Sequence, residues 1–243
     1  MGRRTTSRPD TVHASRVARR FFRLCQEWRA LRFGRLGRQH VGSIEWEDGH
    51  LIIDYGNRTI GLKIVFFGPA MSGKTTTIRW LFSELGITEK LTSIENTLGR
   101  TMFCDFGTIP CNLSDSWRIN AHIWSATGQD FYRSTREVVL VGADGVVFVA
   151  DSQEHLLDEN LESWNELMAM IIEGDRPLPI VVCLNKQDLP DTINEERLRE
   201  HLNLPLSVPV FRSVAMSGFN VIEAFQLLFQ QSMRASAMVQ ATP

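Results

Sequence analysis

A glycine-rich loop lies between a run of apolar residues and an amphipathic segment, which is the setting of a phosphate-binding loop. Residues 68–75 read Gly-Pro-Ala-Met-Ser-Gly-Lys-Thr, a complete GxxxxGK[ST] motif. Its glycines let successive backbone N–H groups turn inward around phosphates, Lys74 reaches the β- and γ-oxygens, and the Thr75 hydroxyl ligates Mg²⁺. Residues 62–67 predict a buried strand before the loop, and residues 76–82 predict a helix whose N-terminus faces the anion. The residues predicted to bind a nucleoside triphosphate are Gly68, Met71, Ser72, Gly73, Lys74, Thr75 and Thr76.

A second motif indicates which base accompanies those phosphates. The apolar run 179–184 predicts another buried strand, which leads directly into Asn-Lys-Gln-Asp at 185–188. A carboxylate at Asp188 accepts hydrogen bonds from N1–H and N2–H₂ of guanine, a donor pair that adenine lacks, so such a site rejects adenine. The four residues also suit an ordinary surface turn, but they end a strand, where open α/β sheets bind ligands. The predicted base-contacting residues are Asn185, Lys186, Asp188 and, in a loop after the predicted strand 208–212, Ala215.

With both motifs in place, residues 51–233 resemble the small Ras-like GTPases and, within them, the prokaryotic MglA group. The resemblance implies GTP and GDP as ligands and Mg²⁺ as cofactor. It also implies a P-loop NTPase fold of class α/β, with a Ras-like, mixed but mostly parallel sheet and helices on both faces. It rests on four further strings, which are residues 53–55 leading into 63–65, Arg-Thr-Met-Phe-Cys-Asp-Phe at 100–106, Gly128-Gln129 with Phe131-Tyr132, and Gly-Val-Val-Phe-Val-Ala-Asp-Ser-Gln at 145–153.

The resemblance assigns roles to residues outside the two motifs. Thr101 resembles the first-switch threonine whose hydroxyl completes Mg²⁺ coordination beside a γ-phosphate, although a threonine at the start of a strand is common in any protein. Arg100 resembles the arginine that neutralises charge between the β- and γ-phosphates. Gly128 is expected to donate its backbone N–H to the γ-phosphate, and Gln129 to orient the attacking water. Arg100, Gln129 and Lys74 form the predicted catalytic set.

Two positions depart from the family pattern. Ser125 stands where Ras-like proteins in general carry an aspartate that supports Mg²⁺, an aspartate that the MglA group also lacks. Gly99 stands where MglA relatives often carry an acidic residue. Asp105, on the neighbouring predicted strand, is the carboxylate placed to face the ion instead. Thr75, Thr101 and Asp105 are therefore the predicted metal ligands. Because of Gly99, metal affinity or switch geometry is expected to differ from that of MglA relatives.

Charge is distributed unevenly along the 243 residues. The net charge is −2, yet residues 1–40 hold eleven arginines against two acids, which leaves 15 basic and 26 acidic residues in the remainder. We divide the chain into a basic amphipathic N-terminal extension (1–43), a Ras-like GTPase domain (44–236) and a short tail (237–243). Four cysteines without a CxxC spacing indicate free thiols and a cytoplasmic protein. No nucleic-acid partner is expected.

Within the extension, residues 14–33 have the pattern of a basic amphipathic helix. Such a helix binds anionic membrane surfaces, which would make the protein peripheral to a membrane. The same pattern suits packing on the GTPase body, binding of an acidic partner, or a targeting presequence, and the sequence leaves all four open. The apolar positions recur at spacings of four and three and are Val17, Phe21, Leu24, Trp28 and Leu31.

The remaining chain is predicted as alternating strands and helices, which is typical of a parallel sheet covered on both faces. Residues 86–100 are expected to be irregular. The strands 101–106 and 117–124 are expected to be antiparallel, joined by a short loop with Gly107 and Pro110. A small hairpin turned at residues 48–49 is expected to join the extension to the core. Further predicted strands are 145–151, 180–185 and 208–212, and further predicted helices are 131–141, 157–172, 195–202 and 220–233.

The leading functional hypothesis is a molecular switch that hydrolyses GTP to GDP, slowly without a partner, and binds its partners in a nucleotide-dependent way. The resemblance implies a roadblock-type MglB-like dimer as regulator and leaves the effectors open. The alternative is a nucleotide-bound scaffold that does not hydrolyse GTP, which Ser125, Gly99 and the added helix favour. An adenine-specific P-loop enzyme is a third alternative.

Overall fold

The computed structural model describes residues 52–95, 101–113, 116–126, 133–174 and 177–239. No helix in these ranges combines the length and the apolar character needed to cross a bilayer. Several sequence predictions fall outside the described residues, namely the helix at 14–33, the hairpin turn at 48–49, Gly99, Arg100, Gly128 and Gln129.

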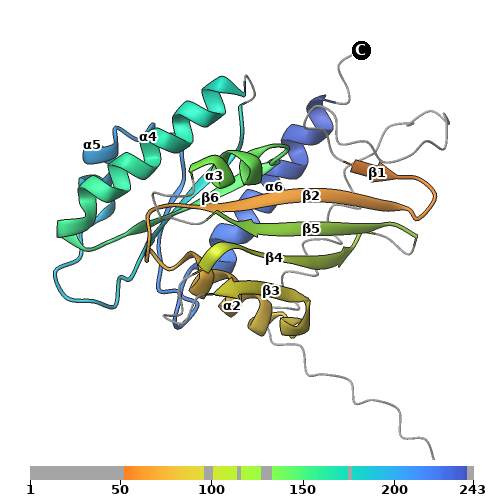
Figure 1. Cartoon of the computed structure of the whole chain (residues 1–243), viewed down its shortest axis with the longest axis horizontal. Coiled ribbons are helices and arrows are strands. Elements are labelled where there is room, and N and C mark those ends of the chain that lie inside the picture. Colours follow the sequence, from red (N-terminus) through yellow and green to blue (C-terminus); the bar gives the residue numbers. More distant parts are fainter. Residues whose placement is uncertain (1–51, 96–100, 114–115, 127–132, 175–176, 240–243) are drawn as a thin grey trace, which may run out of the picture.

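The described strands form one mixed sheet (Figure 1). They are β1 Ile52–Asp54, β2 Thr59–Phe67, β3 Leu91–Glu95, β4 Thr101–Asn112, β5 Arg118–Ser125, β6 Gly145–Asp151, β7 Ile180–Asn185 and β8 Val210–Arg212. Their order is β3-β4-β5-β2-β6-β7-β8, and β1 pairs with the beginning of β2. Neighbours from β5 to β8 are parallel, whereas β4 runs antiparallel to both β3 and β5. The predicted mixed, mostly parallel sheet is confirmed.

Helices cover both faces of this sheet (Figure 1). They are α2 Lys74–Glu84, α3 Arg133–Leu140, α4 Leu157–Glu173, α5 Glu195–Leu202 and α6 Val221–Val239, with the short 3₁₀ turns η2 Thr88–Lys90 and η4 Glu154–Leu156. Side chains of α2 and α6 belong to one hydrophobic core, and those of α3, α4 and α5 belong to a second one. Because β6 lies between the two cores, all its residues are buried, which explains its unbroken apolar run.

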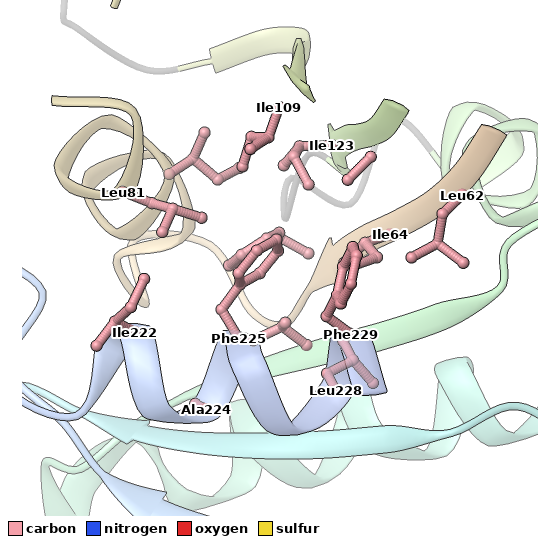
Figure 2. Close-up of a cluster of buried hydrophobic side chains, with 14 of the residues drawn as sticks. Leu62, Ile64, Leu81, Ile109, Ile123, Ile222, Ala224, Phe225, Leu228 and Phe229 are labelled. Carbon is pink, nitrogen blue, oxygen red and sulfur yellow. The ribbon is translucent and has the colours of Figure 1, made fainter. Parts of the chain in front are cut away.

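The core under α6 fixes the strand that leads into the phosphate loop. Figure 2 shows Phe225 and Phe229 of α6 pointing toward the side chains around Ile64 of β2. All three side chains are fully or almost fully buried. Burying an aromatic side chain contributes about 1.5–3 kcal/mol, so this contact holds β2, and with it the start of the loop, against the rest of the domain.

Two predictions around β4 are wrong. Residues 91–95, expected to be irregular, form β3 and pair with the first half of β4. β4 itself continues through Gly107 and Pro110, which the sequence analysis places in a loop. A Cβ at residue 107 would lie 2.6 Å from the Phe82 ring, so that glycine serves close packing rather than a turn. Pro110 lies beyond the last residue that β3 covers, where β4 is an edge strand and tolerates proline.

Candidate nucleotide site

The phosphate loop connects β2 to α2 through three residues with left-handed backbone. Gly68, Met71 and Gly73 have φ angles of 139°, 61° and 104°. A Cβ at Gly68 would overlap the backbone oxygen of Val149 in β6, and a Cβ at Gly73 would overlap the side-chain amide of Asn185. Both end glycines are therefore required by the backbone conformation and by their neighbours.

Lys74 lies across the inside of this loop. Its ammonium donates hydrogen bonds to the backbone oxygens of Gly68 (2.9 Å) and Pro69 (2.6 Å), and the side chain is buried. Burial and, to a smaller extent, the charge of Arg136 together lower the pKa of Lys74 to about 7, while the charge of Asp105 opposes the shift. An anion in the loop favours the protonated form of this side chain.

Thr75 and Asp105 bring two oxygen ligands together beside the loop. The Thr75 hydroxyl donates a 2.6 Å hydrogen bond to Oδ2 of Asp105, which reaches the site from β4 and is completely buried. Hydroxyl and carboxylate oxygens are the ligands that Mg²⁺ prefers, and Mg²⁺ usually takes one or two carboxylates together with phosphate oxygens. Within the described ranges, no group of three or more His, Cys, Asp or Glu side chains gathers to form a metal cage.

Two buried serine hydroxyls, one in the phosphate loop and one at the end of β5, are consistent with a polar ligand. Ser72 lies in the phosphate loop and Ser125 at the end of β5, and both are almost fully buried. Among the described residues, neither Oγ atom has a hydrogen-bond partner. Buried hydroxyl groups are nearly always satisfied in native proteins. The residues present therefore fit a phosphorylated ligand and its metal ion.

Asn185, at the end of β7, links the phosphate loop to the predicted base loop. Its amide donates to the backbone oxygen of Ser72 (2.8 Å), and its Oδ1 accepts from the backbone N–H of Ala215 (2.9 Å). The side chain is 2% exposed, so both hydrogen bonds are shielded from water. Three segments far apart in the sequence thus meet at one buried amide.

The turn after β7 presents the other residues of the second motif. Lys186 has a left-handed backbone (φ 68°), and its ammonium forms an ion pair with Asp151 at the end of β6 (2.5 Å). Gln187 forms two hydrogen bonds with the segment 212–213. Its backbone N–H donates to the backbone oxygen of Ser213, and its side-chain oxygen accepts from Nε of Arg212. The next residue, Asp188, is exposed, so its carboxylate lies at the surface of this turn.

The remaining predicted residues differ in what the structure describes of them. The backbone of Thr101 opens β4 and pairs with Glu95 of β3. Thr101 is four residues from Asp105, which in an extended strand corresponds to about 13 Å. Thr76 lies in the first turn of α2, directly after the loop. Arg100, Gly128 and Gln129 lie outside the described residues.

Sequence reasoning assigned no role to two charged residues, of which Arg136 lies near Lys74 of the phosphate loop and Asp151 lies beside Lys186 of the turn after β7. Arg136 of α3 is 7% exposed and forms an ion pair with Glu166 of α4 (2.7 Å). The burial of Arg136 depends on how α3 packs against α4, and no pattern in the neighbouring sequence predicts this packing. Asp151 is fully buried beside Lys186. Its one signal in the sequence is an acidic residue at the end of an apolar strand, followed later by a lysine at the end of another.

Comparison with known proteins agrees with this geometry. The model of the ADP-ribosylation factor family matches residues 51–232. The chain is 35% identical over 181 residues to the mutual gliding-motility protein MglA of Myxococcus xanthus, a match that covers 72% of this chain and 91% of that protein. It is 25% identical over 177 residues to Rab-7b of Bos taurus, covering 72% and 84%, and 25% identical over 185 residues to Rab7 of Drosophila melanogaster, covering 75% and 85%.

The sheet order, the phosphate loop and the motif after β7 define a P-loop nucleotide-binding protein with Ras-like topology. Within that class, the chain belongs to the small Ras-like GTPases, in the MglA group.

Proposed function

We propose that this protein is a GTP-binding molecular switch that hydrolyses GTP to GDP and contacts its partners in a nucleotide-dependent way. The observation that carries the proposal is the bridge made by Asn185 between the backbones of Ser72 and Ala215. It joins the phosphate-binding end of the site to its base-binding end. A ligand that carries phosphates at one end and a flat, polar ring at the other matches both ends.

The turn after β7 is proposed to bind the guanine base. Asp188 supplies the carboxylate that accepts from N1–H and N2–H₂, while Lys186 and Ala215 line the base from the two loops that flank it. At the other end, the loop N–H groups and Lys74 hold the phosphates. Because adenine lacks the matching donor pair, the carboxylate favours GTP and GDP over the adenine nucleotides.

Thr75 and Asp105 are the proposed ligands of Mg²⁺, with Thr101 as an additional ligand in the triphosphate state. The ion supplies neutralisation of charge on the phosphate oxygens. Since Thr101 lies about 13 Å along an extended strand from Asp105, its ligation requires the first residues of β4 to leave β3. A segment that pairs in one state and ligates in the other is what a switch needs.

Hydrolysis is assigned to Gln129, Arg100 and Lys74. Gln129 orients the attacking water, Gly128 holds the γ-phosphate, and the two cations neutralise the charge that develops on the leaving phosphate. The reaction is expected to be slow alone, because both Gln129 and Arg100 must be positioned. A partner that fixes either residue accelerates the reaction.

The proposed regulator is a roadblock-type MglB-like dimer, as the resemblance implies, and the effectors are proteins that bind the GTP-loaded form. Residues 14–33 are proposed to bind an anionic membrane surface, so that a cytoplasmic protein becomes peripheral to the membrane. Their arginine content and apolar spacing support this proposal. No nucleic acid is expected among the partners.

Single-turnover hydrolysis of GTP by the full chain tests the proposal. Without a partner, the protein is expected to hydrolyse GTP slowly but faster than buffer, and a candidate MglB-like dimer is expected to accelerate it. Gln129→Leu should slow hydrolysis at least about tenfold while leaving GDP affinity unchanged, because the glutamine acts on the water alone. An unchanged rate in Gln129→Leu would remove its assigned role.

One observation favours a second candidate, a guanine-nucleotide-bound scaffold that does not hydrolyse GTP. Ser125 places a buried hydroxyl where Ras-like proteins outside the MglA group carry a carboxylate that supports the metal ion. If the same single-turnover assay shows no hydrolysis above buffer, with or without the partner, the scaffold is the better account.

A further inference from the structure

A buried acidic residue next to the base-binding turn has no role in the function proposed so far. Asp151 ends β6 and pairs across the sheet with Asn185, the last residue of β7. Its backbone N–H donates to Oδ1 of Asn160 (2.8 Å), and its backbone oxygen accepts from the Asn160 amide (2.8 Å). Because Asn160 is also fully buried on α4, the main chain of Asp151 is fixed by two shielded hydrogen bonds.

The two carboxylate oxygens of Asp151 have different neighbours. Oδ1 accepts from the backbone N–H (3.2 Å) and the side-chain amide (3.1 Å) of Gln153. Oδ2 lies 2.5 Å from the Lys186 ammonium, and no other described residue donates a hydrogen bond to it. A buried carboxylate needs a compensating charge. In the described part of the chain, that charge on Oδ2 comes from Lys186.

The ion pair determines where the Lys186 side chain runs. Its backbone is left-handed, a conformation that is unfavourable for a residue with a side chain and persists when its surroundings enforce it. The residue before it, Asn185, is held by the phosphate loop and Ala215, and the residue two positions later is Asp188. The lysine stem therefore crosses from the base-binding turn to the end of β6 at a fixed place.

We propose that Asp151 is a positioning residue for guanine recognition, acting through Lys186. This inference rests on the proposed function, because it requires that guanine binds beside Asp188 and that the aliphatic part of the Lys186 side chain lines one side of the base-binding site. A long side chain that loses its anchor regains rotamer freedom and turns toward solvent. The Lys186 side chain then no longer lines the base-binding site, and the guanine nucleotide dissociates faster.

The test measures the dissociation rate of a ribose-labelled fluorescent GDP from the full chain with Mg²⁺. The variants are Asp151→Asn, Lys186→Met and the double variant. Asp151→Asn is expected to accelerate dissociation about tenfold. The double variant is expected to release GDP no faster than Lys186→Met alone, because the aspartate acts through the lysine. A general loss of stability would not produce this pattern.

Asp144→Asn is the matched control. Asp144 is also a buried aspartate, but it lies just before β6, where its carboxylate accepts from the backbone N–H of Lys63 (2.8 Å). This substitution is expected to leave the GDP dissociation rate within about twofold of wild type, even if it lowers the thermal midpoint.

The proposal is overturned if Asp151→Asn keeps the wild-type dissociation rate, or if the effects of the two single substitutions multiply in the double variant. If Asp151→Asn does not fold, the double variant decides, because it removes both charges. Equal rates in the double variant and in Lys186→Met support the proposal, and a faster double variant overturns it. Failure of the proposed function looks different, since the wild-type chain would then bind GDP no more tightly than ADP.

Discussion

Lys74 is a buried cation whose charge depends on pH in the physiological range. Its pKa is lowered to about 7, first by burial and then by the charge of Arg136. Phosphate oxygens favour the ammonium and raise this pKa, so GDP binding at about pH 8 is expected to take up about one proton. The affinity should fall as pH rises from about 7 to 9. Calorimetric titrations in buffers of different ionisation enthalpy measure the uptake, and a binding heat at pH 8 that is independent of the buffer would contradict it.

Asp188 is exposed at the end of the base-binding turn, where substitution is expected to leave the fold unchanged. Asp188→Asn replaces two acceptor oxygens with one acceptor and one donor. The variant should bind GDP at least about tenfold more weakly and prefer a xanthine nucleotide, whose ring offers an oxygen in place of the N2 amine. Competition of GDP and xanthosine diphosphate against a fluorescent nucleotide measures the change. Unaltered selectivity would rule out the role assigned to this carboxylate.

At the level of single residues, the sequence predicts those parts of the site that are formed by residues adjacent in the chain. The loop residues from Gly68 to Thr75 surround one anion, so their fixed spacing is recognisable in the sequence as a phosphate-binding motif. The ion pair of Asp151 with Lys186 joins two strands that only the sheet order makes neighbours. No spacing rule indicates such a pair, since the intervening helix can have many lengths.

At the scale of elements, β4 links the site to the sheet edge. It carries Asp105 into the site on one side, while β3 pairs along its first half. The sequence does not indicate β3, because this short segment has few apolar residues and forms a strand through its pairing with β4. Gly107 and Pro110 suggest a loop when read alone, although packing and edge position explain both.

Gly107→Ala tests that packing explanation. The added Cβ would lie 2.6 Å from the Phe82 ring and 2.7 Å from the backbone oxygen of Lys90, and the fully buried Phe82 has little room to move. Overpacking of this kind costs about 1–3 kcal/mol of unfolding free energy, which urea denaturation measures. Gly174→Ala is the control, because its Cβ would meet only backbone oxygens at 3.4 and 3.6 Å. Equal denaturation midpoints for the two variants would disprove the explanation.

At the scale of the whole molecule, the sequence predicts most of the architecture. The buried runs at 145–151 and 180–185 are unbroken because helices cover both faces, and the parallel order follows from their alternation with helices. The basic extension is a separate matter. Its amphipathic pattern specifies an apolar face but not the surface that covers it.

Deletion of residues 1–40 tests whether that surface is a membrane. The truncated chain loses eleven arginines and the apolar stripe, so its binding to vesicles of anionic lipid should fall at least about tenfold at low salt. Co-sedimentation with anionic and with neutral vesicles measures the change, and GDP affinity serves as the control for an intact domain. Equal sedimentation of the full and truncated chains would exclude the membrane and leave packing, an acidic partner or targeting.

The most direct measurement is isothermal titration of the purified, folded chain with GDP and with ADP in the presence of Mg²⁺. With phosphates held by Lys74 and the base read by Asp188, GDP is expected to bind at least about 100-fold more tightly than ADP. Equal affinities for the two nucleotides would contradict the account, because the phosphate loop would then bind without any contribution from the turn after β7.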